Sequence, residues 1–446
     1  MSMGLIMCLC VFIGGMFLGV PLAWLFFAGP VAGLMADGMN MAFIGGTFYH
    51  SIFSSTVMAI AFFVYGGSLI SDAGLADRIV RFSYALVGRL RGGMEAVGIV
   101  AAVFLGALTG SSVPVISALI PLLVPRLKKY GYEPKYTTAV LCSSSFLGYL
   151  IPPSVPALIY CLLAQQSVTA LFLSTVIPGL ILAGGYALLN YFICPRYINP
   201  ALITEKEDES QSGFAARAKE IASATWSALP ALGCPIIILV GIYGGLCTPN
   251  EAGAIAVVYC FFVGFCVYRE LDFKSFWRST FSSILSVGVI VMLIGGGTVL
   301  ARYLIRIGVA QQIASFMLGA FSSKTMILLA MNLFFLLLGM FLDGTPILIL
   351  GVPLILPLMT QLGMNLVHLG AIIIVNIGLG VVTPPFAMSI FVGSRLSGCS
   401  YTELVPIMMK YLLYVGIPTL LLTTYIPALS CWLPTLLLGP QVVGAW

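Results

Sequence analysis

Charged residues are scarce: only 8% of the 446 residues are Asp, Glu, Lys or Arg, whereas 60% are hydrophobic. Because a soluble domain needs far more charged surface, the composition excludes a soluble domain of useful size. Mean hydropathy is +1.09, and nearly every window of about 20 residues is apolar enough to cross a bilayer core of roughly 30 Å. The apolar segments have helical length and lack the alternation of a membrane barrel. We therefore predict an all-α polytopic membrane protein embedded in a lipid bilayer.

The sequence also lacks the usual signatures of metal and catalytic sites. His50 and His368 are its only histidines and show no HExxH-type spacing, which argues against a metal site. The 11 cysteines are scattered and form no CxxC pair, so we expect buried thiols rather than disulfides. GxSxG-type motifs are absent, and an intramembrane aspartyl protease needs two carboxylates, whereas only Asp343 lies in an apolar segment. We expect neither an enzyme nor a resident cofactor.

Basic residues are few and lie in short loops. The net charge of +5 needs no nucleic-acid partner, because basic loops of this kind set the orientation of a membrane protein. The first 28 residues are apolar without a basic n-region, so we predict a first membrane helix there rather than a cleaved signal.

An internal repeat divides the chain into two halves. Seven proline and glycine residues of the first copy recur 232 positions later without a gap: Pro114, Pro121, Pro125, Gly131, Gly148, Pro152 and Pro153 become Pro346, Pro353, Pro357, Gly363, Gly380, Pro384 and Pro385. In each copy a polar break, TGSSVP or FLDGTP, interrupts apolar sequence, and a proline pair in GYLIPP or GVVTPP interrupts it again. Broken hydrophobic segments at corresponding positions of two halves are typical of the binding site of a secondary transporter.

A polar stretch separates the two copies and sets the predicted domain organisation. Residues 1–198 form the first half, 199–225 a polar linker and 226–446 the second half. Besides scaffold helices, each half contains a helical hairpin followed by a broken helix. We place hairpin 1 at about 93–125 with its broken helix at about 136–160, and hairpin 2 at about 325–358 with its broken helix at about 368–392.

The distribution of Lys and Arg predicts how the two hairpins enter the membrane. Basic residues lie on both sides of hairpin 1: Arg78, Arg81, Arg89 and Arg91 precede it, and Arg126, Lys128, Lys129 and Lys135 follow it. Both flanks are therefore predicted to be cytoplasmic, so this hairpin is re-entrant. The loop after hairpin 2, residues 360–368, contains no Lys or Arg, which predicts entry from the outer face. Opposite insertion of two related hairpins predicts an inverted repeat.

Asp343 is a carboxylate inside the apolar run LLLGMFLDGTPILIL. A charge at membrane depth costs about 2.5 to 3.5 kcal/mol on insertion scales, so it normally faces a partner, a cavity or an ion. Asp343 also suits the N-cap of the second hairpin arm, and both roles can hold at once. At the matching tip, Thr109, Ser111 and Ser112 supply hydroxyl oxygens, and Ser111 is the repeat equivalent of Asp343.

The proline pairs are expected to supply the second part of each site. A proline pair removes two backbone donors and leaves carbonyl groups free, and freed carbonyls and half-helix ends bind sodium and anions in transporters. Ser144 and Asn376 lie four residues before Gly148 and Gly380, where either cavity lining or helix packing would suit them.

Two further polar groups have structural explanations as well as functional ones. Glu251 fits a capping box with Thr248 and a proline at the first helical position. The segment YRELDFKSFW at 268–277 is typical of the membrane interface, and contact with another subunit is the alternative.

Six stretches, taken in order, resemble the large membrane subunit (DctM or SiaM type) of tripartite ATP-independent periplasmic (TRAP) transporters. They are ALVGRLRGGMEAV (85–97), GSSVPVISALIPLLVPRLKKYGYEP (110–134), LGYLIPPSVPALIY (147–160), GLCTPNEAGAIAVVY (245–259), GMFLDGTPILILGVPLILP (339–357) and VNIGLGVVTPPFAMSIFV (375–392). The resemblance implies a sodium-driven elevator-type transporter of the bacterial inner membrane. It would carry a small organic anion, such as a C4-dicarboxylate or a sialic acid.

The resemblance also implies partners and site residues. A periplasmic substrate-binding protein would deliver the anion, and a separate small membrane subunit of the Q type would be needed, since the four-helix N-terminal portion of fused members is missing. Sodium would be the coupling ion, bound in the first site by Gly106, Thr109, Gly148, Ile151 and Pro153 and in the second by Gly339, Asp343, Gly380, Thr383 and Phe386. Our candidate substrate contacts are Ser111, Ser112, Ser144 and Asn376. The alternative function is a sodium/dicarboxylate symporter that needs no binding protein.

Overall fold

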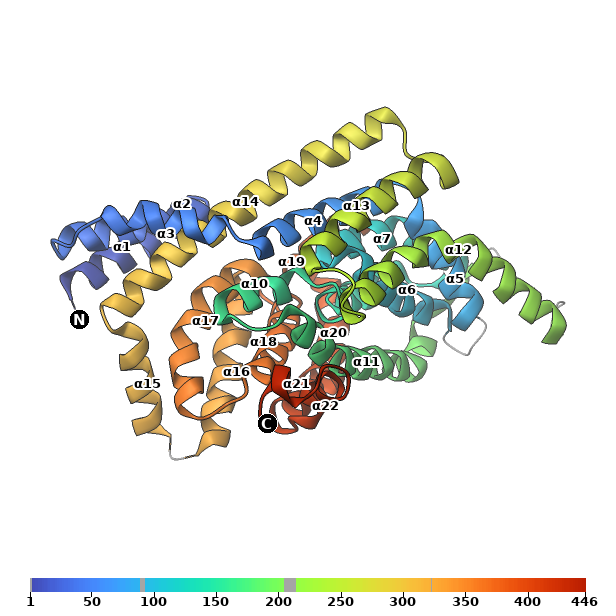
Figure 1. The fold of residues 1–446 in the computed structure, drawn as a ribbon. Helices are drawn as coiled ribbons and strands as arrows, with labels where there is room; N and C mark the ends of the chain where they lie inside the picture. Colours follow the sequence, from blue (N-terminus) through green and yellow to red (C-terminus); the bar gives the residue numbers. More distant parts are fainter. Residues whose placement is uncertain (1, 89–92, 204–213, 322) are drawn as a thin grey trace.

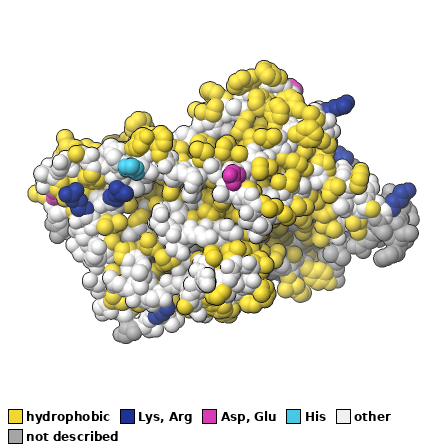
Figure 2. Space-filling model, in the orientation of Figure 1, with side chains coloured by type: hydrophobic (Ala, Val, Ile, Leu, Met, Phe, Trp, Pro, Cys, Tyr) yellow, Lys and Arg dark blue, Asp and Glu magenta, His cyan; other side chains and the backbone are white. Residues whose placement is uncertain are grey.

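The computed structural model describes residues 2–88, 93–203, 214–321 and 323–446. Within these ranges, seven helices are long and apolar enough to cross a membrane, or up to nine if each of two bent helix pairs counts as one span. The prediction of a polytopic helical membrane protein is confirmed. Figure 2 shows hydrophobic side chains spread over much of one face, with Lys and Arg side chains toward its two sides.

The first part of the chain contains eleven α-helices, a 3-10 turn and a small sheet. They are α1 (Met3–Phe17), α2 (Leu22–Ala36), α3 (Ala42–Ile52), α4 (Ser55–Asp72), α5 (Leu75–Val87), α6 (Gly93–Thr109), α7 (Ser112–Lys129), β1 (Tyr130–Tyr132), α8 (Pro134–Ser144), α9 (Leu147–Leu150), α10 (Val155–Ala164), α11 (Val168–Ile193), η1 (Cys194–Tyr197) and β2 (Ile198–Ile203). The two strands pair antiparallel.

In the second part of the chain, every element of the described residues is a helix. It comprises α12 (Phe214–Tyr243), α13 (Pro249–Phe262), the π-helix η3 (Val263–Tyr268), α14 (Phe273–Arg306), α15 (Val309–Ala320), α16 (Lys324–Phe341), α17 (Gly344–Gln361), α18 (Leu366–Gly380), α19 (Met388–Ser397), α20 (Tyr401–Tyr411), η4 (Leu412–Gly416), α21 (Ile417–Tyr425), α22 (Ala428–Leu438) and α23 (Pro440–Val443). The predicted capping box of Thr248 and Glu251 is confirmed at the start of α13.

The two copies of the repeat adopt the same local structure. Helices α6 and α7 form one hairpin, and α16 and α17 form the other. Each hairpin is followed by a helix that stops at the proline pair and resumes beyond it, as α8, α9 and α10 in the first copy and as α18 and α19 in the second. In the first copy the chain direction bends by 42° at the break. Both proline pairs are joined by a cis peptide bond.

The structure corrects our expectation of one membrane helix over the first 28 residues. Helices α1 and α2 have 15 residues each, and the turn between them contains Gly19, with φ of +77°, and Pro21. Glycine adopts this left-handed conformation without a Cβ clash, and proline cannot continue a helix. Each helix is about 22 Å long, too short to cross the hydrocarbon core alone. The two helices pack against each other instead.

Helix α14 links the N-terminal arm to the hairpins. Its 34 residues run along one side of the molecule (Figure 1). It packs against α2 and α3 toward one end, against α4 toward the other, and against α17 of hairpin 2. Helices α4 and α14 therefore form a frame beside the two hairpins.

Backbone touches backbone at one glycine pair in each repeat. A Cβ atom placed on Gly106 would lie 2.5 Å from the Cα of Gly148, and one placed on Gly339 would lie 2.5 Å from the Cα of Gly380. Carbon atoms at van der Waals contact are about 3.5 to 4.0 Å apart. No larger residue fits unless the hairpin moves away from the broken helix, so these glycines hold the two elements together.

Replacement of Gly339 by Ala should therefore destabilise the protein by about 1–3 kcal/mol, the usual cost of overpacking. Gly184→Ala is the matched control, because its new methyl group meets nothing within 4 Å and the middle of helix α11 favours Ala over Gly by roughly 0.5–1 kcal/mol. Thermal unfolding of both variants in detergent measures the difference. Equal melting temperatures would show that a methyl group at position 339 can be accommodated between hairpin 2 and its broken helix without loss of stability.

Candidate functional site

Both hairpin tips line the same cavity, which has a volume of about 310 Å³. One side is formed by Thr109, Ser111, Val113 and Pro114 of hairpin 1, Asp343 and Thr345 of hairpin 2, and Tyr149, Val155 and Pro156 of the first broken helix. The other side is formed by Val64 and Gly67 of α4 and by Ser286, Val289, Ile290 and Leu293 of α14. Residues more than 200 positions apart thus meet around one space.

The tip of hairpin 1 is closed by the broken helix that follows it. Gly110 has φ of +60°, which lets the chain turn sharply between α6 and α7. The carbonyl oxygen of Gly110 accepts a hydrogen bond from the N–H of Val155 at 3.1 Å. A Cβ on Gly110 would lie 2.6 Å from the carbonyl oxygen of Pro153, and one on Gly148 would lie 2.9 Å from that of Ser111. The structure therefore brings the tip and the proline break into direct contact.

Free carbonyl groups are present at both proline breaks. In the described part of the chain, no backbone amide donates to the carbonyl oxygens of Ile151 and Pro153. The same holds for Thr383 and Pro384 in the second copy. Carbonyl oxygens released in this way are the usual sodium ligands of broken transporter helices, so the arrangement suits a hard cation.

Asp343 occupies the N-cap position of α17, yet its side chain makes no capping hydrogen bond. The side chain is accessible and lines the cavity. Its carboxylate is therefore available to a ligand or ion in the cavity, whereas the capping role rests on its position alone.

The other residues predicted for the second sodium site are arranged around the glycine contact. Gly339 and Gly380 touch through their backbones. The hydroxyl of Thr383 donates to the carbonyl of Leu379 at 2.6 Å. Phe386 is 57% exposed, and its ring centre lies 5.6 Å from that of Phe341. Because an apolar ring offers no oxygen ligand to a hard cation, only the backbone of Phe386 could bind an ion.

The four candidate substrate contacts fall into two groups. Ser111 lines the cavity, and Ser112 is buried beside it, where its side chain interacts with that of Tyr149. Ser144 and Asn376 are fully buried away from the cavity lining. The Ser144 hydroxyl donates to the carbonyl of Val140 at 2.8 Å, and the Asn376 amide donates to the carbonyl and the side chain of Asn332 at 2.9 and 3.1 Å.

Tyr149 is a cavity residue that the sequence reasoning missed. Its side chain interacts with that of Ser112 of hairpin 1. A Cβ on Gly344 of hairpin 2 would lie 3.8 Å from the Tyr149 hydroxyl. Tyr149 therefore lies between the two tips. Its position within the GYLIPP motif could have identified it as a candidate site residue from the sequence.

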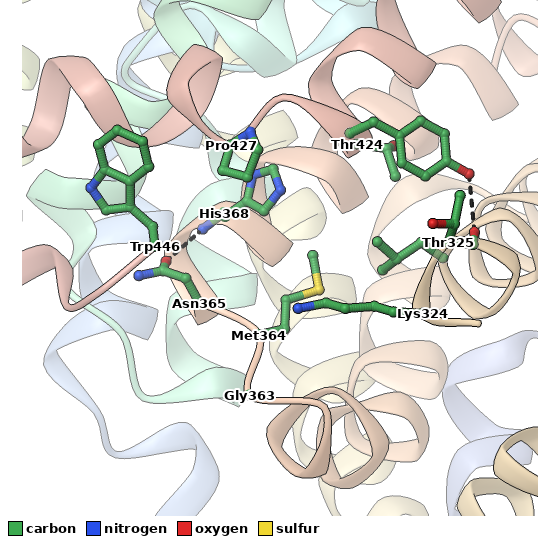
Figure 3. A pocket seen from close by; sticks show the side chains of 11 residues that line it. Lys324, Thr325, Gly363, Met364, Asn365, His368, Thr424, Pro427 and Trp446 are labelled. Carbon is green, nitrogen blue, oxygen red and sulfur yellow. Dashed lines mark hydrogen bonds between the residues drawn. The ribbon is translucent and has the colours of Figure 1, made fainter. Parts of the chain in front are cut away.

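A second pocket, of about 220 Å³, lies at the opposite end of hairpin 2 (Figure 3). Lys324, Asn365, His368, Thr424 and Trp446 are among its lining residues. Its polar groups serve local structure: the Asn365 side chain accepts bonds from two amides at the start of α18, and His368 Nδ1 lies 2.5 Å from the Ser430 hydroxyl. Neither hairpin tip reaches this pocket, so we assign the candidate site to the cavity between the tips.

A polytopic helical chain whose duplicated, interrupted segments enclose one polar cavity has the architecture of a secondary membrane transporter. The comparisons with known proteins agree. Residues 7–429 match the family model described as "Tripartite ATP-independent periplasmic transporter, DctM component". The chain therefore belongs to this family, as the resemblance predicted. It is a large permease component of a tripartite system, not an enzyme, and lies in the bacterial inner membrane.

Individual relatives are similar over nearly their whole length. The C4-dicarboxylate TRAP transporter large permease protein DctM of Vibrio cholerae is 31% identical and is covered over 97% of both chains. The sialic acid TRAP transporter large permease protein SiaM of the same organism is 29% identical, over 96% of this chain and 97% of its own. Among solved structures, the Alcanivorax borkumensis YdaH transporter has a similar fold, with a TM-score of 0.61 over 88% of each chain at 16% identity.

Replacement of Tyr149 by Phe should lower transport by about fivefold while the protein stays folded, because it removes one polar hydroxyl from the cavity, and the loss of one hydrogen bond to a ligand costs about 1 kcal/mol. Tyr243→Phe is the matched control: its hydroxyl is buried and has no partner among the described residues, and it does not line the cavity. Uptake into proteoliposomes measures the effect. Equal rates for the two variants would exclude a role for the Tyr149 hydroxyl.

Proposed function

We propose that this chain is the sodium-coupled permease subunit of an importer for a small organic anion that carries a carboxylate. The observation that carries the proposal is the meeting of three helix N-termini at the cavity: those of α7, α10 and α17, through Val113, Val155 and Thr345. Each helix N-terminus bears about half a positive charge and offers free N–H groups to an anion. The relatives named above carry C4-dicarboxylates and sialic acid, which share a carboxylate group.

Sodium is proposed as the coupling ion because each hairpin tip lies beside free carbonyl groups. In the first site, Thr109 would contribute with the backbone of Gly106, Gly148, Ile151 and Pro153. In the second, Asp343 would contribute with the backbone of Gly339, Gly380, Thr383 and Phe386. One elementary charge moving across 100 mV supplies about 2.3 kcal/mol, enough to drive accumulation.

The composition of the cavity supports an elevator motion. The hairpins and proline-broken helices form one side, and α4 and α14 form the other. Each tip is held to its own broken helix through a glycine contact. We propose that hairpins and broken helices move as one body against a frame that contains α4 and α14. A periplasmic binding protein would deliver the anion, and a small membrane subunit would complete the complex.

Asp343→Asn should abolish sodium-dependent uptake, by at least about 100-fold, while leaving the fold intact, because Asn can still occupy an N-cap but cannot neutralise a cation. Asp272→Asn is the matched control, since that carboxylate caps α14 by accepting from the Ser275 amide at 2.7 Å and lies outside the cavity. The assay is uptake by the complete complex in proteoliposomes, with sodium or choline outside at a fixed proton gradient.

Two outcomes of this assay would contradict the proposal. Undiminished uptake in choline would exclude sodium coupling, and normal sodium dependence in Asp343→Asn would leave that residue only a capping position. Saturable uptake by this chain without any soluble protein would instead favour a symporter that is independent of a binding protein.

A disulfide between the frame and hairpin 2 should stop transport. A Cβ placed on Gly297 of α14 would lie 3.2 Å from the Cβ of Ile349 in α17, close to the roughly 3.5–4.5 Å span of a disulfide, and neither residue belongs to the proposed ion or substrate sites. In a background without the native cysteines, oxidised Gly297→Cys with Ile349→Cys should lose uptake, and reduction should restore it to the rate of the unoxidised pair.

The matched control links two elements on the same side of the proposed motion. A Cβ on Gly29 of α2 would lie 3.8 Å from that of Phe12 in α1, so Gly29→Cys with Phe12→Cys should transport equally well whether oxidised or reduced. Mass spectrometry confirms complete linkage. A fully linked Gly297–Ile349 pair that transports at its reduced rate would refute the moving-body assignment.

A further inference from the structure

A basic pocket of about 390 Å³ is separate from the cavity between the tips. It is formed by α5, the C-terminal end of α7 and α12, through Arg81, Tyr84, Arg126, Ser223 and Ser227. Helices α5 and α12 run beside each other at one end of the molecule (Figure 1). None of the residues of the transport site lines this pocket.

The two arginines of this basic pocket retain the capacity to bind an anion. The guanidinium of Arg126 lies 5.3 Å from the ring centre of Tyr84, a contact that orients the charge without neutralising it. No carboxylate of the described residues lies within ion-pair distance of Arg126. Arg81 contacts Asp77 at 2.7 Å through Nε, and its guanidinium carries four further N–H donors. The pocket therefore keeps a net positive charge beside Asp77.

Helix α12 brings hydroxyl groups to the same space. Ser223 and Ser227 are four residues apart, so they share one face of the helix, and both are exposed. Lys219, also exposed, lies one turn earlier on that face. Two guanidinium groups and two hydroxyl donors around one opening match the oxygens of a phosphate group, which arginine binds in a bidentate manner.

The basic pocket also has the surroundings of a lipid headgroup site. Trp226, on α12 between the two serines, is 78% exposed, and exposed tryptophans gather at the headgroup level of a bilayer. Arg81 and Arg126 belong to the basic flanks of hairpin 1 that are predicted to be cytoplasmic. Basic pockets between membrane helices on the cytoplasmic side bind anionic lipid headgroups.

We propose that this pocket binds the phosphate of an anionic phospholipid headgroup, with Arg81 and Arg126 on its oxygens and Ser223 and Ser227 as additional donors. Such a lipid joins α12 to α5 and to the end of α7. A free phosphate ion shares the recognised group and is the alternative source of the ligand.

The test is lipid retention by the purified full chain, measured by native mass spectrometry after exchange into micelles that contain phosphatidylglycerol or phosphatidylcholine. We expect one phosphatidylglycerol per chain to be retained in preference to phosphatidylcholine. Arg81→Gln and Arg126→Gln should each weaken retention about fivefold, and together about 25-fold, from the usual contribution of a basic residue near a charged bilayer surface. Lys274→Gln, which removes an exposed basic residue of α14 outside the pocket, should leave retention unchanged.

The remaining arms separate the possible outcomes. Arg126→Lys keeps the charge without the bidentate fork and should retain an intermediate amount of phosphatidylglycerol. If the glutamine variants do not fold, this variant and a second one, Ser223→Ala with Ser227→Ala, test the pocket by milder changes. If inorganic phosphate raises the melting temperature of the protein and phosphatidylglycerol does not, the lipid assignment is wrong and the ligand of the pocket is a soluble phosphate. Equal phosphatidylglycerol retention by wild type and the double arginine variant, or equal loss in Lys274→Gln, would overturn the proposal.

Discussion

The structure depends on one constraint: backbone polar groups at membrane depth must find partners inside the protein. Two hairpin tips and two proline breaks create such groups, and the fold packs each hairpin against the break that follows it, which pairs some of them and leaves the carbonyls of Ile151, Pro153, Thr383 and Pro384 without a backbone donor among the described residues. In the first copy, the N–H of Val155 bonds to the carbonyl of Gly110 at 3.1 Å. This closure needs backbones to touch, which explains glycine at Gly106 and Gly148 and again at Gly339 and Gly380.

The duplicated tips are alike in backbone and different in charge. Ser111 and Asp343 occupy equivalent positions, each at the N-cap of the second hairpin arm, and both line the cavity. A neutral hydroxyl at one tip and a carboxylate at the other make the two proposed ion sites unequal in electrostatic strength. A carboxylate adds a full negative charge to the ligand set, so the site at Asp343 should hold a cation more firmly than the site at Thr109.

Helix ends could be predicted from the sequence because proline and glycine act locally. Each proline pair ends a helix whatever surrounds it, and in the structure the second arm of hairpin 1 ends at Lys129 and that of hairpin 2 at Gln361. The first 28 residues were misread because an apolar stretch has the same hydropathy with or without a turn. Gly19 and Pro21 held the only local signal for that turn.

Contacts between distant segments were the part that local patterns could not supply. Ser144 and Asn376 have the right spacing for cavity residues, but their helices direct both side chains into the buried core. There, the Asn376 amide donates hydrogen bonds to Asn332 of hairpin 2. Conversely, Tyr149 and Ser286 reach the cavity only because α9 and α14 are brought there by tertiary packing. The direction of a side chain in the fold depends on the elements that pack against its helix, and the local pattern of a short sequence segment does not determine which elements these are.

Among the described residues, no lysine or arginine lines the cavity, which constrains how an anion can bind there. Three helix N-termini supply only partial positive charges, and Asp343 opposes them with a full negative charge. An organic anion entering without cations would therefore meet a near-neutral or repulsive site in a medium that screens charge poorly. Cations at the proposed sodium sites would reverse that balance, so anion affinity would rise with sodium occupancy. Linkage would then require that the anion tighten sodium binding by the same factor, and the proposed coupling of the two fluxes would follow from the lack of a fixed cation in the cavity.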